Sequence, residues 1–437
     1  MAPKKAERLK EQLLRKDAPA SEAVYFTTGC TLLDLSIGGG AGMGFRGGTL
    51  VNLVAVEGAG KTQLAAECIA HNFHKRKDKA FWHEYLDREH RFSFDTEGMW
   101  GVTVCDKAKE CPDTIEEWDG HLGNLLEAHS TPGIVVTDSL DAFSTEETEA
   151  RADQREGQVK RGDDIKQDGS YTISTGTPKF LSETLRIRMA QAAKSNSLIL
   201  LLSQVRTKLG AMAFDPNKLQ RNGGKALDHW CNDIIWLKVV RYITVGDKKS
   251  GTERKIGAVV KAWGQKSSSA RPYREVFYSI LFAYGIDNVG SNLDFLYNLR
   301  DYEGQNIGDL NKNAQAIRWD GGEEYTLAAA KRWLEANGGE GLDLLGDYQA
   351  HLKDCTGSRT FQIGELLDKW VEGYHPELYA QFTANFHPVT YDREALIAKI
   401  EADPDLEAEL TRRVIAKWEA IEAAAMPVRK PKFGGAA

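Results

Sequence analysis

Runs of apolar residues alternate with amphipathic segments through the first two thirds of the chain. Uninterrupted apolar runs predict buried strands, and apolar residues three or four positions apart predict helices that cover them. The predicted strands are Leu50–Val54, Ala80–Asp87, Val102–Val104, Gly133–Asp138 and Ser197–Leu202. The predicted helices are Gln63–His74, Thr114–Ala128 and Phe180–Ala193. This alternation favours an α/β fold with a mostly parallel sheet that is covered on both faces.

Later segments extend this core and then change in character. Three further strands are expected to add to the sheet in antiparallel fashion: Ile234–Val245, Lys255–Trp263 and Pro272–Phe282. From about Leu293 the pattern becomes helical and polar, with tryptophans spread through it at Trp319, Trp333, Trp370 and Trp418. We therefore predict a small α-rich C-terminal domain.

These patterns divide the chain into four parts. They are an N-terminal helical oligomerisation segment (1–26), a core (27–292), a C-terminal helical domain (293–425) and a disordered basic tail (426–437). The helix predicted over Lys4–Lys16 is either a solvated terminal helix or an arm that docks on a neighbouring subunit. Leu140–Lys179 is polar and lacks apolar periodicity, so most of it is predicted to be a mobile surface excursion.

Composition narrows the class of protein. Charged residues make up 27% of the 437 residues and hydrophobic residues 42%, which is an ordinary soluble balance. The sequence has no apolar run long enough to span a membrane and no signal peptide, and its six scattered cysteines suit a reducing cytoplasm. The net charge of −7 argues mildly against nucleic-acid binding, but a local basic surface can override the total.

The most informative segment is VNLVAVEGAGKT, Val51–Thr62, in which an apolar strand runs into a loop and then a helix. Such a loop turns backbone N–H groups toward phosphate oxygens. Lys61 would reach the terminal phosphates of a nucleoside triphosphate, and the Thr62 hydroxyl would hold Mg²⁺. Ala55 stands where the usual pattern has glycine, which is acceptable if that residue needs no positive φ.

Three polar residues follow predicted strands in the order that a triphosphatase requires. Asp138 is placed to hold Mg²⁺, Glu89 to activate a water molecule, and Gln204 to bind the γ-phosphate. The carboxyl ends of parallel strands meet at one edge of the sheet. Each residue alone could be an ordinary polar group at a strand end, but together they predict a catalytic site.

Several segments resemble those of one known protein family, and they occur in the same order along the chain. They are TTGCTLLDLSIGGG, the loop with Glu57, Asp87–His90, IVVTDS with Asp138, Ser203–Arg206, TKLGAMAFDPNKLQRNGGKAL and Val259–Lys261. This series is similar to the RecA family of recombinases over Thr27–Asn288, and more faintly over Ala395–Trp418. The resemblance implies a RecA-type P-loop ATPase core that uses ATP and Mg²⁺.

The resemblance also implies roles for individual residues. The nucleotide-binding set would be Glu57, Gly58, Ala59, Gly60, Lys61, Thr62, Gln63, Lys261 and Lys266. Lys261 would reach the ATP of a neighbouring subunit. The resemblance implies a second lysine of this kind. Without an insertion, its position in this sequence is occupied by Trp263, and Lys266 matches it only if a small insertion is allowed.

Two loops, at about 144–179 and 205–227, would bind DNA by resemblance. In the second loop, basic side chains suit phosphates, apolar side chains can wedge between bases, and glycines allow close approach. The candidate DNA-binding residues are Lys179, Ser182, Arg186, Arg206, Lys208, Met212, Phe214, Gly223, Gly224 and Lys225. In the first loop acidic residues cancel the basic ones, so none is assigned before Lys179, which begins the helical segment that also carries Ser182 and Arg186.

The function predicted from these features is that of an ATP-dependent recombinase. It would form a helical filament on single-stranded DNA and promote pairing and strand exchange with homologous duplex DNA, in a bacterial or phage-infected host cytoplasm. A ring-shaped motor or helicase and a weakly hydrolysing accessory protein remain alternatives. Ala55, the long first loop, the unmatched residues 300–390 and the basic tail indicate a divergent member, which we take to be phage-encoded.

Overall fold

The computed structural model describes residues 23–76, 80–150, 176–207, 219–221, 224–269, 271–304, 306–311, 314, 317–318 and 390–425. The chain divides into two compact units, Met1–Ser291 and Asn292–Ala437. Lys4–Lys16, most of the excursion before Lys179, the centre of the second predicted DNA loop, Trp319, Trp333, Trp370 and the tail lie outside the described residues.

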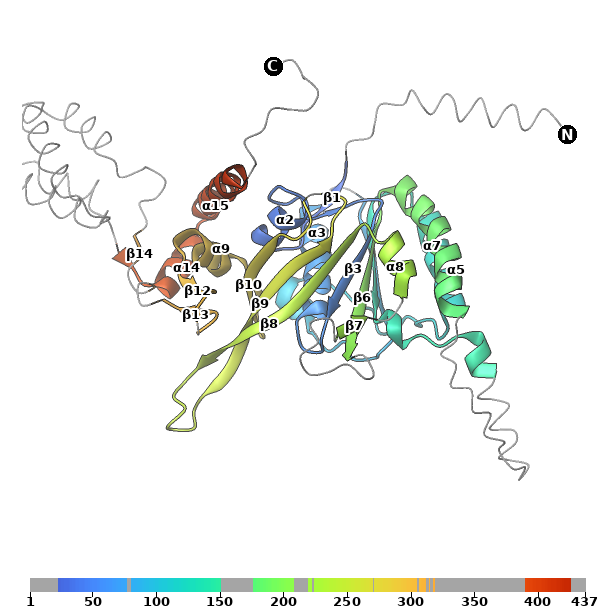
Figure 1. The fold of residues 1–437 in the computed structure, drawn as a ribbon, viewed down its shortest axis with the longest axis horizontal. Coiled ribbons are helices and arrows are strands. Elements are labelled where there is room, and N and C mark those ends of the chain that lie inside the picture. Colours follow the sequence, from blue (N-terminus) through green and yellow to red (C-terminus); the bar gives the residue numbers. More distant parts are fainter. Residues whose placement is uncertain are drawn as a thin grey trace, which may run out of the picture. The chain divides into compact units, whose positions relative to one another are not determined.

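A nine-stranded sheet forms the centre of the first unit (Figure 1). Its strands are β3 (Leu50–Ala55), β4 (Trp82–Asp87), β5 (Gly133–Asp138), β6 (Leu198–Thr207), β7 (Leu219–Arg221), β8 (Asp233–Val245), β9 (Arg254–Lys266), β10 (Glu275–Leu281) and β11 (Gly285–Asp287). Their order is β11-β10-β9-β8-β3-β6-β5-β4, and β7 pairs with β6. Strands β8, β3, β6, β5 and β4 are mutually parallel. The antiparallel addition predicted for Lys255–Trp263 and Pro272–Phe282 is confirmed by β9 and β10, and β11 adds a further antiparallel strand. For Ile234–Val245 the prediction is wrong toward the sheet, because β8 pairs parallel to β3 and is antiparallel only to β9.

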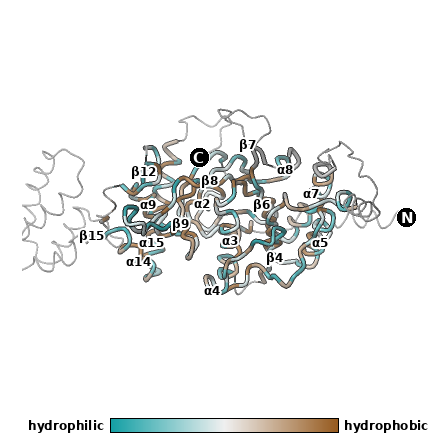
Figure 2. Tube along the Cα trace, turned by 90° about the horizontal axis from the view of Figure 1, so that it is seen from below, coloured by the Kyte–Doolittle hydropathy of each residue, from teal (hydrophilic) through white to brown (hydrophobic). Residues whose placement is uncertain are grey.

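Helices cover both faces of this sheet. The helices of the unit are α2 (Thr31–Ile37), α3 (Lys61–Lys75), α4 (Thr96–Trp100), α5 (Ile115–Ala128), α7 (Gly176–Ser195), α8 (Gly224–Trp230) and α9 (Asn288–Tyr297), which crosses the boundary between units. A 3-10 turn, η2 (Leu140–Ala142), and a small pair, β1 (Tyr25–Phe26) with β2 (Phe45–Arg46), complete it. Helices α5 and α7 lie side by side in Figure 1. Hydrophobic and hydrophilic residues alternate along α5 in Figure 2, as expected of a helix that covers a core.

The core beneath α5, α7 and α8 explains why the apolar runs fold as they do. Alternate residues of the parallel strands, such as Leu50 and Val54 of β3, belong to the same buried cluster as Trp118 of α5, which is fully buried. The Trp118 indole donates a hydrogen bond to Thr137 Oγ1 at 3.0 Å, which satisfies its polar group. The other alternate residues face α3, so these strands are apolar on both sides.

The structure departs from the sequence prediction at several element boundaries. The predicted strand Val102–Val104 is wrong: both valines are buried, but Val104 N–H donates to Thr96 Oγ1 at 3.2 Å instead of joining the sheet. Strand β10 begins at Glu275 rather than Pro272, because Pro272 cannot donate to a ladder and Tyr273 has a φ of 65°. Helix α7 begins four residues earlier than predicted.

The second unit contains helices and short strand pairs in its described part. They are α14 (Arg393–Glu401), α15 (Pro404–Ala424), β12 (Arg300–Asp301) with β13 (Asp309–Leu310), and β14 (Ile317–Arg318) with β15 (Thr390–Tyr391). Buried Asp294 accepts hydrogen bonds from Arg300 Nε at 2.5 Å and Arg393 Nε at 2.7 Å. Across both units, no helix of the described residues combines the length and apolar character that a membrane crossing requires.

Candidate functional site

The loop between β3 and α3 has the backbone form of a phosphate cradle. Gly58 and Gly60 have φ values of 75° and 86°, and a Cβ at Gly60 would lie 2.5 Å from Ile280 Cδ1. The positive φ favours glycine at Gly60, and a larger residue would also have to displace the end of the Ile280 side chain. Ala55 ends β3 and does not have a positive φ, so alanine suits the first position of the loop.

Lys61 and the start of α3 direct positive charge into this loop. Lys61 is buried, and its Nζ donates hydrogen bonds to the carbonyl oxygens of Ala55 at 3.0 Å and Val56 at 3.3 Å. The N-terminal end of α3 adds the positive end of its dipole at the same place. The ammonium group and the helix end thus point toward one small region.

Thr62 and Asp138 meet beside the loop, although they are 76 positions apart in the chain. Thr62 Oγ1 donates to Asp138 Oδ2 at 2.8 Å, and Tyr85 Oη donates to the same oxygen at 2.7 Å. Burial raises the pKa of Asp138, and the two hydrogen bonds oppose that shift. A hydroxyl and a carboxylate are hard oxygen ligands that suit Mg²⁺ held partly by phosphates and water.

Glu89 and Gln204 form a second contact at the same edge of the sheet. Gln204 Nε2 donates to Glu89 Oε1 at 2.6 Å, and the Glu89 side chain is 20% exposed. Partial burial and then the nearby Asp138 carboxylate raise the pKa of Glu89. The pairing of the strands brings these groups to the same edge of the sheet. Gln204 of β6 lies opposite Ala55 of β3, and Asp138 of β5 lies opposite Asp87 of β4, two residues before Glu89.

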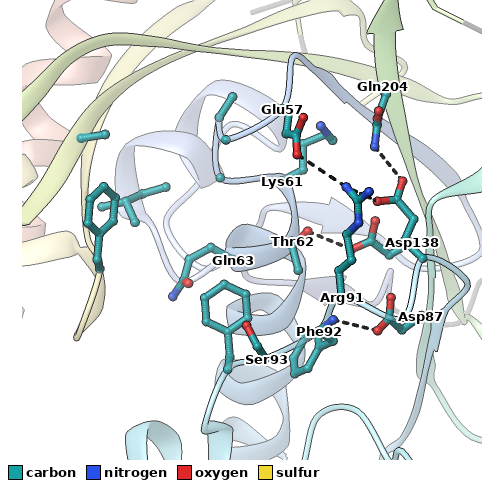
Figure 3. A pocket seen from close by; sticks show the side chains of 18 of the residues that line it. Glu57, Lys61, Thr62, Gln63, Asp87, Arg91, Phe92, Ser93, Asp138 and Gln204 are labelled. Atoms are coloured by element: carbon teal, nitrogen blue, oxygen red, sulfur yellow. Dashed lines mark hydrogen bonds and ion pairs between the residues drawn. The ribbon is translucent and has the colours of Figure 1, made fainter.

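These groups line one cavity of about 450 Å³ (Figure 3). Its residues are Glu57, Gly58, Ala59, Gly60, Lys61, Thr62, Gln63, Asp87, Glu89, Arg91, Phe92, Ser93, Phe94, Asp138, Gln204, Ala258, Val260, Ile280 and Phe282. One part of the wall is polar and converges on the loop, and another is apolar and comes from β9 and the end of β10. This combination suits a ligand with a charged end and a flat apolar end.

Comparison with known proteins identifies the family of this chain. The RecA N-terminal domain family matches residues 10–287.

The chain belongs to the RecA family.

Protein RecA of Xylella fastidiosa strain 9a5c is 28% identical over 316 residues, which are 70% of this chain and 82% of that protein. Protein RecA of Thioalkalivibrio sulfidiphilus strain HL-EbGR7 is 26% identical over 302 residues, 67% of this chain and 78% of that protein. A crystal structure of the RadB recombinase is 19% identical and covers 60% of this chain and 98% of that chain, with a TM-score of 0.40. Membership of the RecA family confirms the resemblance and supports nucleotide binding and a function in recombination.

Two lysines predicted to bind nucleotide lie away from the cavity of their own subunit. Val260 of β9 lines the cavity, so Lys261, the next residue, lies on the opposite face of that strand. Lys261 Nζ is 2.6 Å from Glu275 Oε2. Lys266 Nζ donates to the carbonyl oxygens of Asp228 at 2.8 Å and His229 at 3.1 Å, at the end of α8.

The predicted DNA-binding residues are described only in part. Ser182 and Arg186 are exposed on one face of α7, four residues apart, and Lys179 belongs to the same helix. Arg206 lies in β6, which continues to Thr207 and pairs with β7, while Gly224 and Lys225 begin α8. Lys208, Met212, Phe214 and Gly223 lie outside the described residues.

The structure adds site residues that the sequence argument missed. Tyr85 bonds to Asp138, Arg91 lies at the mouth of the cavity, and Phe282 contributes to the apolar wall. Tyr85 and Arg91 are close in sequence to the Asp87–His90 segment, which is the signal that could have drawn attention to them. Phe282 had no local signal, because it reaches the site only through the position of β10 in the sheet.

Gln63 lines the cavity, but its side chain is engaged by a buried carboxylate. Gln63 Nε2 donates to Glu67 Oε1 at 3.0 Å, and Ile286 N donates to the same oxygen at 2.7 Å. Burial raises the pKa of Glu67 to about 7, against an ordinary value of 4.5, although both hydrogen bonds favour the charged form. Gln63 thus connects the start of α3 to a group that titrates near neutral pH.

We expect the stability gained by replacing Glu67 with Gln to increase as the pH rises from about 5 to about 8. Because the folded-state pKa of Glu67 is raised, its favourable contribution is complete below its ordinary pKa and is lost as the pH rises through about 7. In the wild type this loss is at most about 3 kcal/mol, and glutamine removes it.

Urea unfolding of both proteins across this pH range measures the difference in free energy of unfolding. Burial also raises the pKa of Asp34, to about 6, but Asp34 is present in both proteins and cancels in the comparison. A difference between the two proteins that stays constant with pH would contradict the prediction.

Proposed function

We propose that this chain is an ATP-dependent recombinase that forms helical filaments on single-stranded DNA and exchanges strands with homologous duplex DNA. The observation that carries the proposal is the convergence of the phosphate loop, Asp138, Glu89 and Gln204 on one cavity. In this proposal the apolar wall at Ile280 and Phe282 receives the base, and the loop receives the phosphates. The protein would act in a bacterial or phage-infected cytoplasm.

Nucleotide and metal would be held by the residues around Lys61. The loop N–H groups and Lys61 would bind the phosphates, and Thr62 and Asp138 would ligate Mg²⁺. When bound, Mg²⁺ would neutralise part of the charge that develops on the phosphates during transfer. Tyr85 would keep the Asp138 carboxylate oriented through its hydrogen bond.

Glu89 would accept a proton from the water that attacks the γ-phosphate. Its raised pKa makes it a stronger base than an exposed carboxylate. The Gln204 amide holds Oε1 of Glu89 at 2.6 Å, and Oε2, which lies 3.5 Å from Arg91 Nη1, would accept the proton. The products would be ADP and phosphate.

Gln204 offers a route from nucleotide state to the DNA-binding segment. It lies in β6, and β6 runs on through Thr207 to pair with β7. A shift of Gln204 toward a bound γ-phosphate would therefore move the strand that carries the predicted DNA loop at 205–227. Hydrolysis would then change the population of DNA-gripping states.

Self-association would complete the site. Lys261 lies on the face of β9 away from its own cavity, so it can reach a nucleotide only in another subunit. A head-to-tail contact of this kind produces a helical filament when its rotation does not close. Residues 1–26 would serve as the oligomerisation arm and residues 293–425 as a separate helical domain.

Electron microscopy of the protein with ATP, Mg²⁺ and single-stranded DNA, with an ATPase assay on the same sample, tests the proposal. We expect extended helical filaments and hydrolysis that DNA stimulates. Closed rings would overturn the filament proposal in favour of a motor. Coated DNA without hydrolysis would indicate an accessory DNA-binding protein.

A further inference from the structure

Arg91 lies at the mouth of the cavity, in the loop that carries Glu89. Two hydrogen bonds turn this loop tightly: Phe92 N donates to Asp87 Oδ2 at 2.8 Å, and His90 N donates to Asp87 O at 3.3 Å. His90 itself has a φ of 54°, as a tight turn requires. The turn directs the Arg91 side chain across the cavity rather than away from it (Figure 3).

The Arg91 guanidinium joins two walls of the site. Its Nη1 lies 3.5 Å from Glu57 Oε1 in the phosphate loop and 3.5 Å from Glu89 Oε2. The side chains of Arg91 and Glu57 are 69% and 83% exposed, so this ion pair contributes little to stability. A phosphate, which guanidinium binds with two parallel hydrogen bonds, can replace these carboxylates at small cost.

The charges of the cavity give a reason for such an exchange. Among its lining residues, the carboxylates are Glu57, Asp87, Glu89 and Asp138, and the cationic side chains are Lys61 and Arg91. A triphosphate remains negative after it binds Mg²⁺, so it requires cations at its terminal phosphate. Arg91 is the second cation that the described lining residues provide.

We propose that Arg91 contacts the terminal phosphate of the nucleotide bound in its own subunit. This inference rests on the proposed function of the cavity as an ATP site. The sequence offers Trp263 where a second lysine from the neighbouring subunit is expected, and two carbonyl oxygens hold the alternative, Lys266. Arg91 supplies that charge within the same subunit.

The affinity of the full chain for triphosphate relative to diphosphate tests this contact. Arg91→Gln should weaken binding of a fluorescent non-hydrolysable ATP analogue about tenfold or more, since a charge-assisted hydrogen bond is lost. Binding of fluorescent ADP should change little, because ADP lacks the terminal phosphate. Arg91→Lys should restore part of the affinity, because it keeps the charge but loses the second hydrogen bond.

Arg412→Gln is the matched control, because the Arg412 side chain is also 69% exposed and also pairs with a glutamate. It should leave both affinities unchanged. Equal losses for the analogue and ADP, or no loss for either, would overturn the role of Arg91 while leaving the ATP site intact. If the wild-type chain binds neither nucleotide, both the proposed function and this inference are overturned.

Discussion

Replacing Glu89 with Gln is expected to lower the rate of ATP hydrolysis by about 10²- to 10⁴-fold, the usual contribution of a general base. Glutamine has nearly the same shape, and its carbonyl oxygen can still accept the hydrogen bond from Gln204, now 2.6 Å from Glu89. It cannot accept a proton from water. Nucleotide affinity should therefore remain close to that of the wild type. Steady-state hydrolysis with single-stranded DNA and equilibrium binding of a fluorescent ATP analogue measure the two effects separately.

Glu407→Gln provides the control for this change, because Glu407 is an exposed glutamate in the first turn of α15. It should affect neither rate nor affinity. If Glu89→Gln hydrolyses ATP nearly as fast as the wild type, another group activates the water. The base would then have to be sought among the remaining carboxylates of the cavity, which are Glu57, Asp87 and the proposed Mg²⁺ ligand Asp138.

Replacing Asp294 with Ala should lower the free energy of unfolding by about 3–5 kcal/mol, because it removes the buried anion that two buried cations share. The Asp294 side chain is 2% exposed, and those of Arg300 and Arg393 are almost as buried. Arg393 also donates a second hydrogen bond to Asp294, from Nη2 at 3.1 Å. Urea unfolding followed by circular dichroism measures the loss.

Glu394→Ala is the matched control for Asp294→Ala, because it removes a different partner of the same arginine. Glu394 lies 2.7 Å from Arg393 Nη1 but is 78% exposed. Its removal should cost less than about 1 kcal/mol, as for other exposed ion pairs. Similar losses for the two variants would show that burial does not set the strength of this cluster.

Local patterns in the sequence predicted most of the core elements, but several strand ends differ; β6, for example, continues to Thr207 instead of ending at Leu202. Gly133–Asp138 is β5 in the structure, and the predicted helix Thr114–Ala128 is α5 with Thr114 as its N-cap. Such patterns work because alternation, apolar runs and capping residues act within a few positions of one another. Where they failed, at Val102–Val104, the side chain of Thr96, eight positions earlier, took the place of a strand partner.

The sequence also placed Asp138, Glu89 and Gln204 at strand ends, and parallel pairing brings such ends to one edge. It could not show which ends become neighbours. The contact between Gln204 and Glu89 depends on the order β3-β6-β5-β4, and the position of Arg91 depends on the turn held by Asp87.

The sequence by itself therefore determined the family of the chain, the phosphate loop and the residues that could act there. Only the tertiary structure decided that Tyr85 orients toward Asp138, that Lys266 binds carbonyl oxygens, and that Arg91 faces Glu57. The physical reason is the range of the interactions. Strand ends and loops follow from residues a few positions apart, whereas these contacts require hydrogen-bonded ladders and packing between segments far apart in the chain.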